Sequence, residues 1–154
     1  MIAVDFGAGS GGWVIPLAVI LEEGKVFAVD IQEEPLQVLN SKTRLQGISN
    51  VKNIVADVQR TISEFPDTFC DLVLMTNLLF QLDDKRAVFQ EAQRILKQNG
   101  IILVVEWTQE AFFGPKERRI SEEEIKEISQ NAGFKFKEKI DAGDYHYGLI
   151  FLKS

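Results

Sequence analysis

The sequence has one cysteine and one histidine in 154 residues, and fewer basic than acidic residues. With Cys70 alone, an internal disulfide and a cysteine-based metal cluster are excluded, and we expect a buried thiol in a reducing cytoplasm. The net charge of −6 lacks the positive footprint of nucleic-acid-binding proteins. No apolar run approaches the roughly 20 residues that cross a bilayer, and the first residues do not resemble a signal peptide. We therefore expect one globular, cytoplasmic domain over residues 1–154.

Short apolar runs alternate with amphipathic stretches along the whole chain. Strands are expected at 2–4, 25–30, 51–56, 71–75, 101–105, 134–140 and 145–152. Helices are expected at 13–21, 33–46, 83–98 and 121–133, with a weak helical turn in 58–65. This alternation predicts an α/β fold with a mostly parallel sheet and helices on both faces. Only Asp141–Asp144 separates the last two strands, so the final strand is expected to run antiparallel.

A glycine-rich turn joins the first strand to the first helix. Gly7, Gly9 and Gly12 fit the dinucleotide fingerprint G-x-G-x-x-G, and Asp30 follows at the spacing of a ribose-binding acid. Gly7, Gly9 and Gly11 fit equally well a loop that holds S-adenosylmethionine. The amides at a helix start can hydrogen-bond either ligand. The glycines alone therefore leave two cofactors open.

Acidic residues follow the first three strands, at Asp5, Asp30 and Asp57. A carboxylate beside the glycine loop repels a pyrophosphate, whereas it suits the ammonium and sulfonium groups of S-adenosylmethionine. Asp30 can accept hydrogen bonds from both ribose hydroxyls, and Asp57 can accept one from the adenine amino group. The carboxyl ends of parallel strands share one edge of a sheet, so these acids together favour S-adenosylmethionine over a nicotinamide dinucleotide.

The same residues carry a resemblance to the class I S-adenosylmethionine-dependent methyltransferases, in the branch that contains the ubiquinone and menaquinone methyltransferases. Asp5–Gly11, Ala28–Asp30 and Ala56–Asp57 are similar to the first three motifs of that family. Asp71–Leu74 with Asn77–Gln81 resembles the fourth motif. Arg94–Gly100 resembles a segment that usually reads R-x-L-K-P-G-G, with Gln98 and Asn99 in place of proline and glycine. The resemblance covers essentially the whole chain, and a reversed last strand is typical of the family.

The resemblance implies a three-layer αβα sandwich with strand order 3-2-1-4-5-7-6. It also implies that the chain transfers a methyl group from S-adenosylmethionine, with S-adenosylhomocysteine as product. The acceptor is expected to be a small molecule, because the Asn/Asp-Pro-Pro-Tyr/Phe motif of nucleic-acid methyltransferases is missing near 76–79. The residues expected to bind the cofactor are Asp5, Gly7, Ala8, Gly9, Gly11, Asp30, Ile31, Asp57, Val58, Asn77 and Leu78. A binding module without activity and an NAD-dependent oxidoreductase remain as alternatives.

Two loops at the cofactor edge supply the candidates for contact with the acceptor. His146 is the candidate general base, since it is the only histidine of the chain and histidine titrates near neutral pH. Trp107, Arg118 and Tyr145 are candidates for binding the acceptor, and no metal site is expected. Family members generally carry helices before the glycine loop that cover the cofactor. A chain that begins on the first strand is therefore expected to leave an apolar patch uncovered and to form some homodimer.

Overall fold

The computed structural model describes residues 1–154, and its elements follow the predicted alternation of strands and helices. The strands are β1 (Ile2–Phe6), β2 (Lys25–Asp30), β3 (Val51–Val55), β4 (Cys70–Thr76), β5 (Leu96–Trp107), β6 (Phe134–Asp141) and β7 (His146–Lys153). The helices are α1 (Val14–Ile20), α2 (Glu33–Leu45), α3 (Lys85–Ile95) and α4 (Glu122–Asn131), with a short 3₁₀ turn, η1 (Leu79–Gln81). No helix is both long enough and apolar enough to cross a lipid bilayer.

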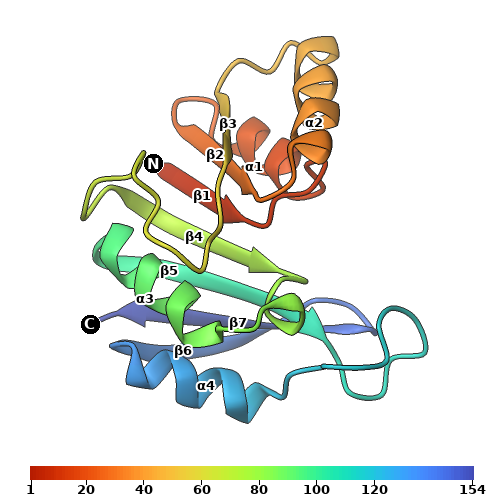
Figure 1. Cartoon of the computed structure of the whole chain (residues 1–154), viewed down its shortest axis with the longest axis vertical. Helices are drawn as coiled ribbons and strands as arrows, with labels where there is room; N and C mark the ends of the chain where they lie inside the picture. Colours follow the sequence, from red (N-terminus) through yellow and green to blue (C-terminus); the bar gives the residue numbers. More distant parts are fainter.

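All seven strands form one sheet in the order β3-β2-β1-β4-β5-β7-β6 (Figure 1). The strands β1 to β5 pair in parallel, whereas β7 runs antiparallel to both of its neighbours, β5 and β6. The short connection between β6 and β7 forces this reversal, because a parallel pair needs a long crossover. The predicted fold class and strand order are confirmed.

Alternate residues of the strands divide the core into two layers. Val4 and Phe6 of β1 face a large apolar cluster that includes residues of α3 and α4. Val26 and Ala28 of β2 belong to a smaller cluster that includes residues of α1 and α2. Helices therefore cover both faces of the sheet, and α3 and α4 lie together in front of it in Figure 1.

Two sequence predictions are wrong in this half of the molecule. The helix predicted over 83–98 ends at Ile95, because β5 begins at Leu96. Residues 58–65 form no helix: Phe65 packs against Phe27 of β2 with ring centroids 5.4 Å apart, and the Ile62 amide donates to Glu91 Oε1 at 3.0 Å. Packing and side-chain hydrogen bonds replace the helix that local propensity suggested.

One face of β4, β5 and β7 carries apolar side chains that are only half-buried. Val73, Val104 and Leu149 point into the large cluster under α3 and α4. Their neighbours along the strands point to the opposite face, where Leu72, Ile101, Leu103, Ile150 and Leu152 share register and are each partly exposed. The sheet therefore presents an open apolar surface on that side.

Candidate functional site

A cleft of about 330 Å³ opens at the carboxyl ends of the first strands. The segments that follow β1, β2, β3 and β4 all contribute to its wall. Its lining residues are Gly7, Asp30, Ile31, Gln32, Ala56, Asp57, Val58, Gln59, Leu78, Gln81 and Leu82. This volume falls at the lower end of small-molecule sites, and the position is the one expected for a ligand of an open α/β sheet.

The cleft brings together part of the predicted cofactor set. Six of the predicted residues line it: Gly7, Asp30, Ile31, Asp57, Val58 and Leu78. The other five, Asp5, Ala8, Gly9, Gly11 and Asn77, do not line it. Five lining residues outside the predicted set are Gln32, Ala56, Gln59, Gln81 and Leu82. Gln59 had a local signal, because an amide two residues after an aspartate commonly closes a turn on that carboxylate, and Asp57 accepts from the Gln59 amide at 2.9 Å.

Asp30 is the central side chain of the cleft. One carboxylate oxygen accepts from the Gly9 amide at 2.9 Å, and the other accepts from the Gln32 amide at 3.0 Å. An ionised carboxylate has about four acceptor positions, so both oxygens keep capacity for a ligand hydroxyl. Asp30 thus fixes the glycine loop and still presents acceptors to the cleft.

The glycine loop lets a ligand approach the backbone closely, but several of its amides already have hydrogen-bond partners in the protein. The amides of Gly7 and Ala8 both donate to the Val29 carbonyl, at 2.8 and 2.9 Å, and the Gly11 amide donates to Ala8. Gly7 has a φ of +75°, and a Cβ there would lie 2.7 Å from the Leu78 side chain. Only glycine fits this place without strain, because a side chain would meet both a left-handed backbone and the wall of the cleft.

Asp5 is more deeply buried than its place beside the loop suggested. The residue is 1% exposed, and its Oδ1 atom has no hydrogen-bond partner. Burial, and after it the negative charge of Asp30, raises the pKa of Asp5 to about 8. A cation placed nearby would favour the carboxylate form and supply the missing partner. This unpaired acid suits a ligand that carries positive charge.

The raised pKa of Asp5 predicts a pH-dependent stability. A carboxyl whose pKa is higher in the folded state makes its full contribution to stability at low pH. This contribution is lost as the pH rises from 3.8, the ordinary pKa of aspartate, to about 8, the pKa of Asp5 in the fold. Asparagine is neutral at every pH, so the melting temperature of Asp5→Asn, relative to that of the wild type, should increase as the pH rises across this range. Thermal melts in a pH series measure the gain. Parallel pH profiles for the two proteins would contradict it.

Glu106, at the end of β5, is a second buried carboxyl, 1% exposed. Its Oε1 accepts from the Leu79 amide at 2.6 Å, at the start of the η1 turn. Burial raises the pKa of Glu106 to about 7, against the opposing effect of the nearby backbone amides. The turn it holds carries Gln81, and Leu78 precedes it, and both line the cleft. Glu106 therefore supports that wall from behind, and an acid directly after an apolar strand was its only sequence signal.

Truncation of Glu106 is expected to loosen this wall. Glu106→Ala should lower the free energy of unfolding by about 1–3 kcal/mol, because the Leu79 amide is left buried without an acceptor. Glu106→Gln keeps an acceptor oxygen at the same place and should retain most of the stability. Denaturant unfolding of both variants measures the difference. Equal losses would show that the hydrogen bond to Leu79 does not matter.

Three of the four candidates for contact with the acceptor make aromatic contacts. Trp107 and His146 are register partners on β5 and β7, and their ring centroids lie 4.1 Å apart. The His146 Nε2 atom is buried without a partner, and burial lowers the pKa of His146. Tyr145 packs edge-on against Phe113 of the loop after β5, with centroids 5.1 Å apart. The predicted residues from the two loops do meet, but through aromatic contacts.

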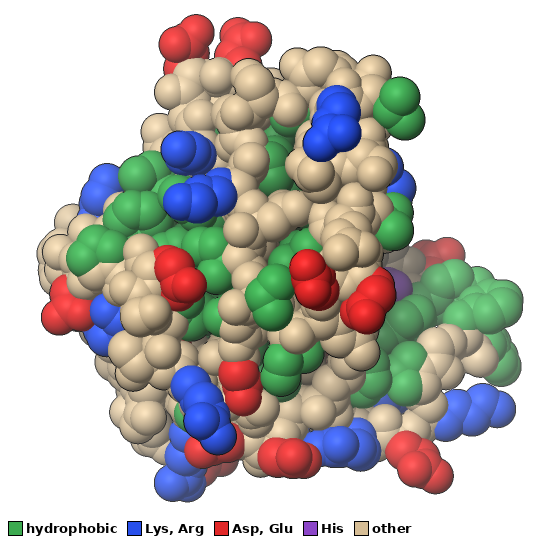
Figure 2. Space-filling view, turned by 45° about the horizontal axis from the view of Figure 1, so that its top comes forward, with side chains coloured by type: hydrophobic (Ala, Val, Ile, Leu, Met, Phe, Trp, Pro, Cys, Tyr) green, Lys and Arg blue, Asp and Glu red, His purple; other side chains and the backbone are tan.

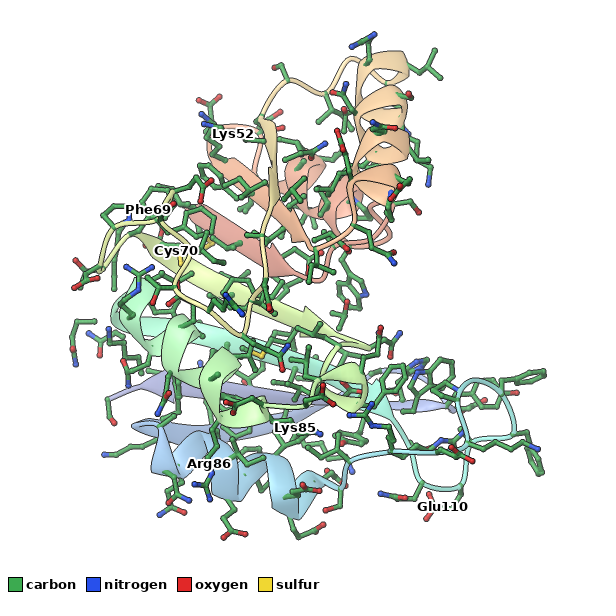
Figure 3. The ribbon with its side chains drawn as sticks, viewed as in Figure 1. Lys52, Phe69, Cys70, Lys85, Arg86 and Glu110 are labelled. Carbon is green, nitrogen blue, oxygen red and sulfur yellow. The ribbon has the colours of Figure 1, made fainter.

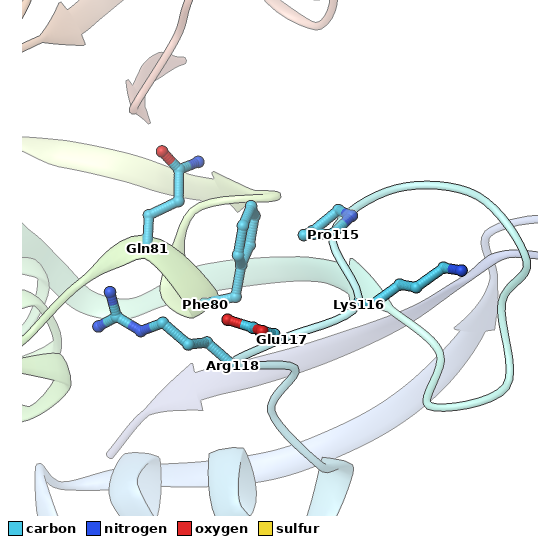
Figure 4. Close-up of a pocket in the computed structure, with 6 residues that line it drawn as sticks. All are labelled: Phe80, Gln81, Pro115, Lys116, Glu117 and Arg118. Carbon is cyan, nitrogen blue, oxygen red and sulfur yellow. The ribbon is translucent and has the colours of Figure 1, made fainter.

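A second, open pocket of about 570 Å³ lies between η1 and the loop after β5 (Figure 4). It is lined by Phe80, Gln81, Pro115, Lys116, Glu117 and Arg118. Gln81 lines the cleft described above as well, so the two spaces are neighbours. Arg118 donates to the Leu82 carbonyl at 3.2 Å and pairs with exposed Asp83 at 3.1 Å, which leaves its charge partly engaged. Figure 3 shows Glu110 on this loop, at the opposite end of the sheet from Cys70.

The residues present fit S-adenosylmethionine better than a dinucleotide. The cleft is lined by two carboxylates and by neutral residues, with no lysine or arginine to meet a pyrophosphate. Behind them, Asp5 is a buried acid with an unpartnered oxygen. An acidic, partly apolar cleft favours a cationic nucleoside.

Comparisons with known proteins agree with this chemistry. A family model described as a methyltransferase domain matches residues 4–104. Over 113 residues the chain is 34% identical to a demethylmenaquinone methyltransferase of Geobacillus stearothermophilus, covering 73% of this chain and 47% of the relative. It is 31% identical over 111 residues to a ubiquinone/menaquinone biosynthesis C-methyltransferase of Vibrio vulnificus, covering 71% and 42%. The chain spans about half the length of the curated relatives it matches.

A solved structure gives the same answer for the fold. A SAM-dependent methyltransferase from Aquifex aeolicus superposes with a TM-score of 0.91 at 27% identity, covering 100% of this chain and 82% of the other. The family match spans the glycine loop, the acids after β2 and β3, and β4, which are the parts that build the cleft. The chain therefore belongs to the class I S-adenosylmethionine-dependent methyltransferases.

Proposed function

We propose that this protein transfers a methyl group to a small acceptor with an apolar, quinone-like ring. The observation that carries the proposal is that the open pocket beside Phe80 adjoins the acidic cleft, because Gln81 lines both. An acceptor in the open pocket would therefore lie next to a cofactor in the cleft. The names of the relatives from Geobacillus and Vibrio support a quinone as the acceptor class. When bound, S-adenosylmethionine supplies an electrophilic methyl group, which a nucleophile attacks in line.

The cofactor is proposed to lie with its ribose on Asp30 and its adenine beside Asp57. Ile31 and Val58 would wall the adenine, and Leu78 would close the cleft from the η1 side. Asp5, Ala8, Gly9, Gly11 and Asn77 complete the proposed set. Asp5 would attract the positive charge of the ligand, and the three loop residues would let the ligand lie close to the backbone. Asn77 has a buried side-chain oxygen without a hydrogen-bond partner, which could accept from the ligand.

The acceptor is proposed to meet Trp107, Tyr145 and Arg118, with His146 as general base. Because burial lowers the pKa of His146, its imidazole is neutral at pH 7 and able to take a proton. Arg118 would attract an oxyanion of the acceptor. His146→Gln should then reduce kcat more than it changes the affinity for the cofactor. An unchanged kcat would remove His146 from this role.

Product analysis tests the proposed activity. The protein is incubated with methyl-labelled S-adenosylmethionine and a panel of hydroquinones, phenols and amines, and both S-adenosylhomocysteine and methylated product are quantified. Methylation of a hydroquinone above the other acceptors supports the proposal. Tight cofactor binding without any methylated product would favour a binding module without activity. Binding of NAD in place of S-adenosylmethionine would favour the oxidoreductase alternative.

We further propose that residues 1–154 act as a single cytoplasmic cofactor-binding domain that forms a homodimer. The open face of β4, β5 and β7 supports the dimer, because an apolar surface of this kind is stabilised by burial against a second copy. Light scattering at increasing concentration should show a dimer, and Leu103→Lys on that face should return it to monomer. A monomer at all concentrations would contradict this part of the proposal.

A further inference from the structure

The loop between β5 and α4 carries two exposed phenylalanines near its middle. Phe112 is 87% exposed and Phe113 is 62% exposed, although both are large apolar side chains. Figure 1 shows this loop extending away from the rest of the molecule, and Figure 2 shows hydrophobic side chains gathered at the end of the same projection. We call residues 108–119 the aromatic loop. Phe113 touches Tyr145 with one edge, but most of the surface of both phenylalanines is left uncovered by the chain itself.

Five carbonyls of the aromatic loop accept hydrogen bonds from one side chain of the same loop. The Arg119 guanidinium donates to five carbonyls of the loop, at distances of 2.5 to 3.1 Å. These carbonyls belong to Thr108, Gln109, Ala111, Phe113 and Pro115. A loop that inserts into an apolar medium must satisfy its carbonyls internally, because an unpaired polar group is costly there. Arg119 thus satisfies five of the loop's carbonyls without water, which lowers the cost of moving the loop into an apolar medium.

The size of the tip favours a lipid surface over a protein partner. Two phenylalanines offer roughly 300–500 Å² of surface, less than the about 800 Å² that one partner of a standard protein interface buries. Interfacial anchors, by contrast, need only a few apolar side chains at the depth of the headgroups. The aromatic loop contains three basic and two acidic residues, so it is locally positive on a chain with a net charge of −6. The charge of the loop itself therefore does not oppose its approach to a lipid surface.

We propose that the aromatic loop docks the protein onto a lipid bilayer by inserting Phe112 and Phe113 between zwitterionic headgroups. The proposal goes beyond methyl transfer and does not depend on the identity of the acceptor. Pro115, Lys116 and Arg118 of the same loop line the open pocket beside the cleft. A protein docked by this tip holds that pocket at the membrane surface, where an apolar acceptor partitions.

Vesicle flotation tests the docking directly. The full chain is mixed with phosphatidylcholine vesicles, and the protein that floats with the lipid is quantified against lipid concentration. The wild type should bind reversibly, and the double variant Phe112→Ser/Phe113→Ser should partition at least about tenfold more weakly, since the buried apolar area is lost. Leu45→Ser is the matched control, because Leu45 is 89% exposed on α2 and should not contribute.

Three results would overturn the proposal. The first is a wild type that does not float, the second is a double variant that floats as well as the wild type, and the third is an equal loss in Leu45→Ser. A size shift of the wild type that the double variant abolishes, without flotation, would instead identify the tip as a protein contact. Calorimetry with S-adenosylhomocysteine should give the same affinity for all variants, so a failure of docking is separate from a failure of the proposed methyl transfer.

Discussion

Asp30→Ala is expected to weaken the binding of S-adenosylmethionine by at least about a hundredfold. The carboxylate would accept hydrogen bonds from ribose hydroxyls, and a hydrogen bond to a charged group contributes about 1.5–3 kcal/mol. The same substitution leaves the Gly9 and Gln32 amides without their acceptor, so the glycine loop loses its support from β2. The variant therefore loses both a direct contact with the ribose and the support of the glycine loop. Isothermal titration calorimetry on the folded variant measures the loss of affinity.

Two further variants make this result specific to Asp30. Asn at position 30 offers one acceptor oxygen in place of two, so its amide nitrogen must face either Gly9 or Gln32, and it should bind almost as weakly as the alanine variant. Asp57→Ala should lose only about tenfold, because a single contact to the adenine is involved. An affinity close to wild type in Asp30→Ala, with the protein folded, would mean that the ribose lies elsewhere.

Gly7→Ala is expected to weaken cofactor binding by about tenfold to a hundredfold. A methyl group at Gly7 would lie 2.7 Å from Leu78 Cδ1, so Leu78 must move, and it lines the cleft. The φ of +75° adds backbone strain of about 1–2 kcal/mol for a residue with a side chain. Overpacking of this kind typically costs about 1–3 kcal/mol, part of which appears as lost affinity.

Gly47→Ala separates the strain from the clash. Gly47 has a φ of +68° and nothing within 4 Å of an added Cβ, and it lies just beyond α2, outside the cleft. It should lose a similar stability from backbone strain and no affinity for S-adenosylmethionine. Thermal melts and calorimetry on both variants give the comparison. Equal affinities for the two variants would show that the contact between Gly7 and Leu78 does not shape the cleft.

Local sequence patterns were sufficient for the sheet and for one side of the site. The apolar runs and the four-residue turn at Asp141–Asp144 predicted seven strands and the reversal of the last one, because strand length and connection length are local properties. Acids directly after a strand are equally local, so Asp30 and Asp57 were correctly placed at one edge. The helix predicted from Ser121 also forms, and the Ser121 side chain caps it by accepting from the Glu124 amide.

Properties that depend on distant neighbours were beyond the sequence. The burial of Asp5 and Glu106 is produced by strands and loops that come together only in the fold, and with it their raised pKa values. The amides of Gly7 and Ala8 looked available, but the Val29 carbonyl accepts from both. Phe65 lies in a segment that looked weakly helical, and its packing on Phe27 replaced the helix.

We propose that S-adenosylmethionine binds in the acidic cleft after β1, β2 and β3. Titration calorimetry of the wild-type chain with S-adenosylhomocysteine, and separately with NAD, tests it most directly. We predict one S-adenosylhomocysteine bound per chain, loss of that binding in Asp30→Ala and no heat with NAD. A folded protein that gives no heat with S-adenosylhomocysteine, or that binds NAD through Asp30, would show that the cleft is not an S-adenosylmethionine site.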